Sequence, residues 1–100
     1  MEKKRIGVLI SGGGTNLQAL IDACEKGEIN GEIAVVLSNK EDAFGLERAR
    51  KAGIRAEYVK WLGMAPEEYD EKLANILIEE GVQLVVLAGW LRVLSRYFIE

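Results

Sequence analysis

Residues 6–16 read IGVLISGGGTN, a short apolar run that leads directly into three glycines, a threonine and an asparagine. A continuous apolar run of this length is typical of a strand that is covered on both faces. The residues that follow have helical periodicity, with Leu17, Leu20, Ile21 and Cys24 at positions i, i+3, i+4 and i+7. The stretch therefore predicts a strand, a tight loop and a helix, an arrangement that directs backbone amides and the positive end of the helix dipole at an anion.

The same alternation continues along the chain. Apolar runs recur at 33–37, 56–59 and 84–88, and segments of helical periodicity lie between them, around 43–49 and 69–80. Because crossovers between parallel strands are right-handed, the order β-α-β-α-β-α-β predicts an α/β fold, a Rossmann-like doubly wound parallel sheet with strand order 3-2-1-4. The first strand is then central, and its carboxyl end opens onto the binding crevice.

Glycine and proline mark the ends of the predicted helices. Gly27, Gly53 and Gly81 each follow a helical segment, at a position that favours a residue in the left-handed conformation. Pro66 suits the first turn of the third helix. The acidic run after it, EEYDE at 67–71, lies at the positive end of that helix's dipole, and we interpret it as a solvated helix start.

The composition narrows the classes of function. A chain of 100 residues with 49% hydrophobic residues is expected to form a single domain over 1–100. Its net charge of −3 comes from 16 acidic and 13 basic residues mixed along the chain, which argues against a nucleic-acid partner. No apolar run approaches the roughly 20 residues of a membrane span, so no membrane partner and a cytoplasmic location are expected. The single cysteine, Cys24, is expected to be buried and inert.

The glycine loop predicts the binding of one phosphate group. Glycines let a phosphate approach the backbone, and Thr15 and Asn16 add side-chain donors at the start of the helix. A tight turn alone would not require three successive glycines. A dinucleotide loop would place a further glycine where Leu17 stands, and a triphosphate loop would place a lysine after Gly14. A phosphate monoester is therefore the expected ligand, bound by Gly12, Gly13, Gly14, Thr15 and Asn16.

Four blocks of the sequence together resemble one enzyme family. They are VLISGGGTNLQALIDA at 8–23, LSNK at 37–40, AFGLERA at 43–49 and VLAGWLRVLS at 86–95. In this order the blocks closely resemble the amino-terminal half of the phosphoribosylglycinamide formyltransferases, the folate-dependent enzymes of purine synthesis. The resemblance spans essentially the whole chain and implies a truncated formyltransferase fold.

The resemblance also implies ligands and site residues. Gly14, Thr15 and Asn16 match positions that hold the phosphate of glycinamide ribonucleotide. Residues 91–94 match a segment that lines the folate pocket, which assigns the binding of 10-formyltetrahydrofolate, the formyl donor, to Leu91, Arg92, Val93 and Leu94. No metal is implied. Residues just after a central strand's carboxyl end face the crevice in such folds, which agrees with this placement.

The chain departs from the family in two places. Pro66 stands where the family often has an arginine before a Glu-x-Tyr-Asp sequence, a change expected to weaken nucleotide binding. The family's catalytic asparagine and histidine, in an Asn-x-His-Pro-Ser segment, and its catalytic aspartate come past position 100, and this sequence has no histidine at all. We therefore expect a substrate-binding half whose catalytic half is absent, and we assign no catalytic residue. Two alternatives stay open, namely a free-standing half-domain that binds a phosphorylated ligand without turnover and a half-fold with no affinity.

Other polar and edge residues carry weaker expectations. Ser38 and Asn39 are expected to form a local turn, and Arg48 and Arg50 to stay solvated. In a sheet of order 3-2-1-4 the apolar run 84–88 lies at an open edge, and long hydrophobic edges pair with other chains. The chain is therefore expected to self-associate.

Overall fold

The computed structural model describes residues 4–12, 15–60 and 64–87. Their elements follow the predicted order: β1 (Lys4–Ile10), α1 (Thr15–Glu25), β2 (Gly31–Ser38), α2 (Phe44–Lys51), β3 (Arg55–Tyr58), α3 (Pro66–Glu79) and β4 (Leu84–Leu87). The strands form one sheet in the order β3-β2-β1-β4, and every neighbouring pair is parallel. The predicted doubly wound sheet with order 3-2-1-4 is confirmed.

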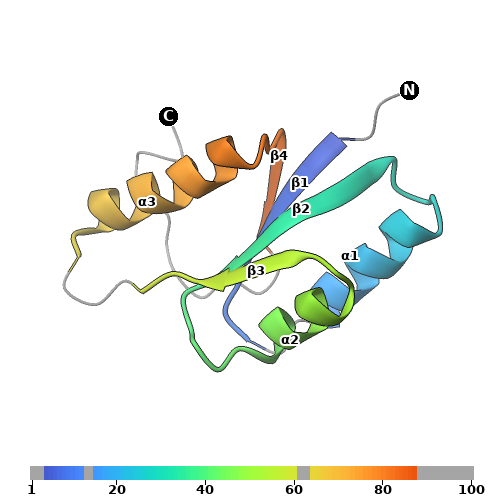
Figure 1. Ribbon diagram of the computed structural model, residues 1–100, viewed down its shortest axis with the longest axis horizontal. Helices are drawn as coiled ribbons and strands as arrows, with labels where there is room; N and C mark the ends of the chain where they lie inside the picture. The colour runs from blue at the N-terminus through green and yellow to red at the C-terminus, as the bar shows by residue number, and fades with distance from the viewer. Residues whose placement is uncertain (1–3, 13–14, 61–63, 88–100) are drawn as a thin grey trace.

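Helices cover both faces of the sheet, with α1 and α2 on one face and α3 on the other (Figure 1). Right-handed crossovers explain this division, because the steps from β1 to β2 to β3 run one way across the sheet and the step from β3 to β4 runs back. Side chains of β1 alternate between the two layers. Ile6 and Val8 pack in the core with α1 and α2, whereas Leu9 packs with Tyr69 and Leu73 of α3.

Gly7, in the middle of β1, lets α3 lie close to the sheet. A Cβ atom at this position would lie 2.5 Å from Cδ2 of Leu77 and 3.2 Å from both methyl groups of Val82. Real Cβ atoms do not approach another heavy atom as closely as 2.5 Å, so a larger residue would force Leu77 into another rotamer or shift α3. The packing of this layer therefore depends on the missing side chain.

The predicted helix ends are confirmed. Gly27, Gly53 and Gly81 have φ angles of 79°, 76° and 69°, the left-handed conformation that glycine adopts without strain. Pro66 is the first residue of α3. Cys24 is buried as expected. None of the helices in the described ranges is long and apolar enough to cross a membrane.

Two predictions about charged side chains are wrong. Asp70, expected in a solvated acidic run, is buried in α3 and is only 1% exposed. Its position is three residues before Leu73, so it faces the same way as the apolar side of the helix. Arg48 is half-buried, because its guanidinium carbon lies 5.1 Å from the ring centroid of Phe44 and its Nη1 donates to Oε1 of Gln18 at 3.4 Å.

Charged side chains join the carboxyl end of α3 to the start of the sheet. Arg5 of β1 donates from Nε to the backbone oxygen of Glu80 at 2.8 Å, and its Nη1 lies 2.9 Å from Oε1 of Glu32. Arg55 of β3 contacts the carboxylates of Glu80, at 2.8 Å, and Glu57. The hydrogen bond to Glu80 raises the pKa of Arg55 above its ordinary value, with the charge of Glu57 acting in the same direction. These contacts fix the edge of the sheet opposite to the loops that follow β1 and β2.

Candidate functional site

Two side chains join the carboxyl ends of the central strands. Ser11, the residue after β1, is buried, and its Oγ donates to Oδ1 of Asn39 at 2.8 Å. Ser38, at the end of β2, makes the expected local turn, since its Oγ accepts from the backbone N–H of Lys40 and donates to the Lys40 oxygen, both at 3.0 Å. Asn39 does more than form a turn, because its side chain reaches across to β1. The pair Ser11–Asn39 fixes the base of the glycine loop relative to β2.

The glycine loop is exposed to solvent at Gly12. Its backbone oxygen accepts from the N–H of Gly45 at 3.1 Å, which ties the loop to the first turn of α2. Gly12 is exposed, and a Cβ atom built on it would have no neighbour within 4 Å. Because α1 begins at Thr15, the amides of its first turn lie only a few residues away and have no partner within the helix. An anion placed here would meet free backbone donors and the positive end of the α1 dipole.

A hollow lies between α1 and β4, where the strand order reverses. Its volume is about 430 Å³, and its walls include Asn16, Ala19 and Leu20 of α1 and Val86 and Leu87 of β4. In open α/β sheets ligands bind in the crevice at this reversal, beyond the carboxyl ends of the strands. Asn16 is exposed in the first turn of α1, so it faces the same crevice as the end of β4.

The end of β3 is held against α3. The hydroxyl of Tyr69, which is fully buried, donates to the backbone oxygen of Val59 at 2.8 Å. The N–H of Val59 in turn donates to the oxygen of Ser38 at 2.8 Å, so α3, β3 and β2 are linked at the same edge of the sheet. These two hydrogen bonds hold α3 against the carboxyl ends of β3 and β2.

A family model described as formyl transferase matches residues 4–100. The chain belongs to the formyl transferase family. Phosphoribosylglycinamide formyltransferase of Escherichia coli is 48% identical to it over 94 residues, which are 93% of this chain and 44% of that protein. The chain spans about half the length of such relatives, since the alignments also cover 46% of the enzyme of Haemophilus influenzae and 50% of that of Dictyostelium discoideum.

Solved structures of this family give the same result for the fold of the chain. Glycinamide ribonucleotide transformylase 1 of Symbiobacterium toebii superposes with a TM-score of 0.90 at 49% identity, over 93% of this chain and 44% of that one. The phosphoribosylglycinamide formyltransferase of Coxiella burnetii superposes with a TM-score of 0.91 at 39% identity, over 98% and 46% of the two chains. The predicted fold and family are therefore confirmed together.

The structure describes part of the site predicted for this member of the formyl transferase family. Gly12 and Asn16 lie at the carboxyl edge of the sheet, and Thr15 is the first residue of α1. Gly13, Gly14 and the predicted folate segment 91–94 lie outside the described residues. The bond between Ser11 and Asn39 was not predicted, and its signal in the sequence is the position of both residues directly after parallel strands. Within the described ranges, no group of three or more His, Cys, Asp and Glu side chains is placed to hold a metal ion.

Proposed function

We propose that this chain is the substrate-binding, amino-terminal part of an enzyme that transfers a formyl group from 10-formyltetrahydrofolate to glycinamide ribonucleotide in purine biosynthesis, in the cytoplasm. The observation that carries the proposal is the open space beside Gly12, between the end of β1 and the start of α1, in a member of the formyl transferase family. Relatives named for this activity match nearly the whole chain. Residues 1–100 are then a half-domain that holds a phosphorylated substrate.

The proposed phosphate site comprises Gly12, Gly13, Gly14, Thr15 and Asn16. The open space beside Gly12 and the start of α1 at Thr15 support it, because a dianion at this point replaces lost hydration with backbone donors and the helix dipole. The bond from the N–H of Gly45 to the oxygen of Gly12 holds Gly12 against α2 before the ligand arrives. A residue that is already held in place loses little conformational entropy on binding, which favours affinity.

The proposed site for the formyl donor is Leu91, Arg92, Val93 and Leu94, a few residues beyond the end of β4. The hollow that Asn16 shares with Leu87 supports this placement, since the chain leaves β4 beside the proposed nucleotide site. Transfer of a formyl group to an amine passes through a tetrahedral oxyanion, which needs aimed donors and a group that moves protons. We assign these roles to the carboxyl-terminal half of such enzymes, and none to residues 1–100.

A second candidate function is the capture of a phosphorylated ligand without turnover. It is favoured by the complete lack of histidine in the sequence, since histidine is the side chain most suited to proton transfer near neutral pH. Calorimetric titration with glycinamide ribonucleotide tests for binding. A folate-release assay, run after addition of a polypeptide that spans the remaining half of the Escherichia coli relative, tests for turnover. We expect binding by the chain alone and turnover only in the mixture, whereas binding without turnover in both samples would favour the second candidate.

Replacement of Gly12 by alanine tests the position of the phosphate. The added methyl meets no protein atom within 4 Å, so the fold should be unaffected, while the affinity for glycinamide ribonucleotide should fall about tenfold. The matched control is Gly27→Ala, which forces a Cβ into the left-handed conformation at φ 79° far from the loop. It should lower the melting temperature by several degrees and leave the affinity unchanged. Unchanged affinity in both Gly12→Ala and the bulkier Gly14→Val would place the phosphate elsewhere.

A further part of the proposal concerns the edge of the sheet. β4 is the last strand on its side of the described sheet, and Leu84 and Leu87 are 51% and 49% exposed. We infer that this edge pairs with another strand, supplied by a second copy of the chain when no other polypeptide covers it.

A further inference from the structure

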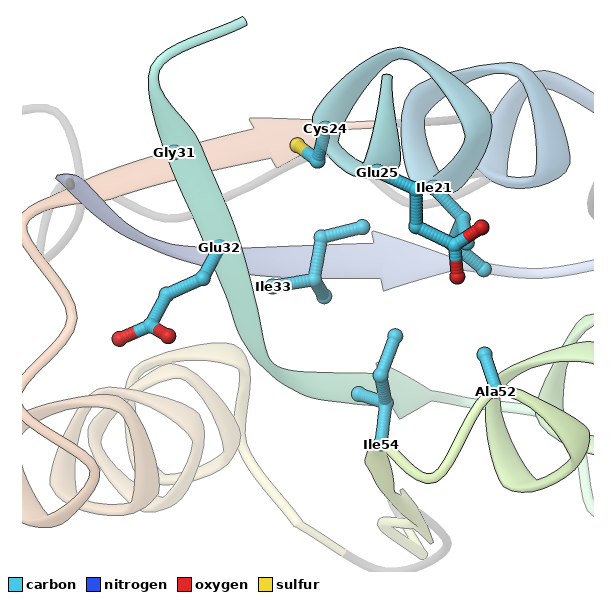
Figure 2. Close-up of a pocket in the computed structure, with 8 residues that line it drawn as sticks. All are labelled: Ile21, Cys24, Glu25, Gly31, Glu32, Ile33, Ala52 and Ile54. Atoms are coloured by element: carbon cyan, nitrogen blue, oxygen red, sulfur yellow. The ribbon is translucent and has the colours of Figure 1, made fainter. Parts of the chain in front are cut away.

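A groove lies between α1 and α2 on the outer side of the sheet, and the part of it next to β2 is an open hollow of about 200 Å³ lined mainly by apolar side chains. Figure 2 shows the side chains of Ile21, Cys24, Ile33, Ala52 and Ile54 directed toward this space from α1, β2 and the ends of α2 and β3. An apolar cavity of roughly 150 Å³ accepts a molecule the size of benzene. This hollow therefore has the size and the walls for one aromatic ring or a branched alkyl group.

Two carboxylates, those of Glu25 and Glu32, also line the hollow. Glu32 points away from the apolar side chains in Figure 2, and its Oε1 lies 2.9 Å from the guanidinium of Arg5. Glu25 is exposed and lies beside Ile21 on the surface of α1. The apolar side chains thus offer contacts to an apolar group, whereas the carboxylate of Glu25, which Figure 2 shows beside Ile21, disfavours an anionic group in this hollow.

A second hollow of about 390 Å³ adjoins the first along the same groove, because Ile21, Glu25 and Ala52 line both. The second hollow differs in charge, since its described lining includes two basic side chains, those of Arg48 and Lys51 of α2, and the carboxylate of Glu25. Its remaining walls include Gln18 and Phe44, the two residues that orient the guanidinium of Arg48.

The guanidinium of Arg48 is held before any ligand binds. It lies over the ring of Phe44, 5.1 Å from the centroid, and Nη1 donates to Gln18 at 3.4 Å. A preoriented guanidinium loses little side-chain entropy on contact with a carboxylate or phosphate, and its planar donors match both groups. Lys51 adds a second positive charge one helical turn away, so an anion in this hollow is favoured over a cation.

We propose that the groove between α1 and α2 binds a small amphiphilic anion, with its ring or branched alkyl group in the apolar hollow and its carboxylate or phosphate group beside Arg48 and Lys51. This site is separate from the proposed nucleotide site. Its apolar part includes Gly31 and Glu32, the first residues of β2, and so lies toward the amino edge of the sheet, whereas the glycine loop lies at the carboxyl edge.

The test compares three probes with the full chain, by NMR titration and calorimetry. 3-Phenylpropionate carries both the ring and the anion, 3-phenylpropylamine carries the same ring on a cation, and propionate carries the anion alone. We expect 3-phenylpropionate to shift the amide signals of α1 and α2 and to bind at least tenfold more tightly than either of the others. Equal affinity for the amine and the carboxylate, or shifts confined to other parts of the chain, would overturn the proposal.

Variants locate the two halves of the site. Lys51→Gln removes one positive charge, and Ala52→Leu places a larger side chain at the junction of the two hollows; each should weaken the binding of 3-phenylpropionate at least fivefold. Lys26→Gln is the matched control, since this exposed lysine follows α1 and lines neither hollow. If Ala52→Leu fails to fold, the comparison of Lys51→Gln with Lys26→Gln decides alone. Equal affinity in those two variants would overturn the proposal.

Discussion

At the scale of single residues, the hydroxyl of Tyr69 makes a bond on which the carboxyl edge of the sheet depends. It is buried and donates to the oxygen of Val59 at 2.8 Å. Tyr69→Phe keeps the ring but leaves the Val59 carbonyl without this donor, so the free energy of unfolding should fall by about 1–2 kcal/mol. Urea denaturation followed by circular dichroism measures the change.

Tyr58→Phe is the matched control for this prediction. Tyr58 lies one residue before Val59 and is 36% exposed. Because this side chain is partly in contact with water, removal of its hydroxyl should change the free energy of unfolding by less than about 0.5 kcal/mol. Equal losses in the two variants would mean that the hydroxyl of Tyr69 contributes no more than a surface group.

The sequence predicts which way a side chain faces better than it predicts which group that side chain bonds to. Periodicity places Tyr69 on the apolar side of α3, and the same periodicity places Asp70 near that side, although its carboxylate argued for solvent. Asp70 is buried because of its position on the helix, despite its polar side chain. The bond between Ser11 and Asn39 could not be predicted, because it joins residues 28 positions apart and depends on the register of β1 and β2. Arg48 is likewise partly covered, by Phe44 one turn earlier in α2 and by Gln18 of α1, and the second contact depends on the approach of the two helices.

At the scale of the elements, α3 packs on β1 through the space that Gly7 leaves. Gly7→Ala would place a Cβ atom 2.5 Å from Cδ2 of Leu77, so α3 must shift or Leu77 must leave its rotamer, at a cost of about 1–3 kcal/mol. Leu77→Val removes that Cδ2 atom and leaves a small cavity. The double variant should therefore be more stable than the sum of the two single changes predicts, by about 0.5–2 kcal/mol in a double-mutant cycle of urea unfolding. Strict additivity would show that the two side chains do not compete for this space.

Element order and strand order were predictable because few topologies fit right-handed crossovers between four apolar strands, and the glycines that end the helices mark the boundaries. The close approach at Gly7 was not predictable. A glycine in an apolar run is compatible with a strand, and only the position of α3 shows which atoms occupy the space of its missing side chain. The groove between α1 and α2 depends on inter-helix geometry in the same way. The start of α1 directly after the glycines was predictable, because these residues are contiguous in the sequence. The open space beside Gly12 was not, because it depends on where the neighbouring elements lie in the fold.

At the scale of the whole molecule, we expect the apolar edge formed by β4 to determine whether copies of the chain associate in solution. Leu84 is 51% exposed on this strand, and β4 pairs only with β1 among the described strands. We expect the apparent mass in light scattering to rise with concentration, because an unpaired apolar strand offers its backbone and side chains to another chain.

Leu84→Lys places a charge on this edge and should suppress the rise. Ile78→Lys is the control, since Ile78 is 72% exposed on α3 and the substitution adds the same charge away from the edge. Because β4 also borders the hollow that contains Asn16, a polypeptide that supplies the neighbouring strand would both suppress self-association and complete the proposed site. A constant monomeric mass in the unmodified chain, or equal suppression by the two lysine variants, would show that β4 is not the surface through which copies associate.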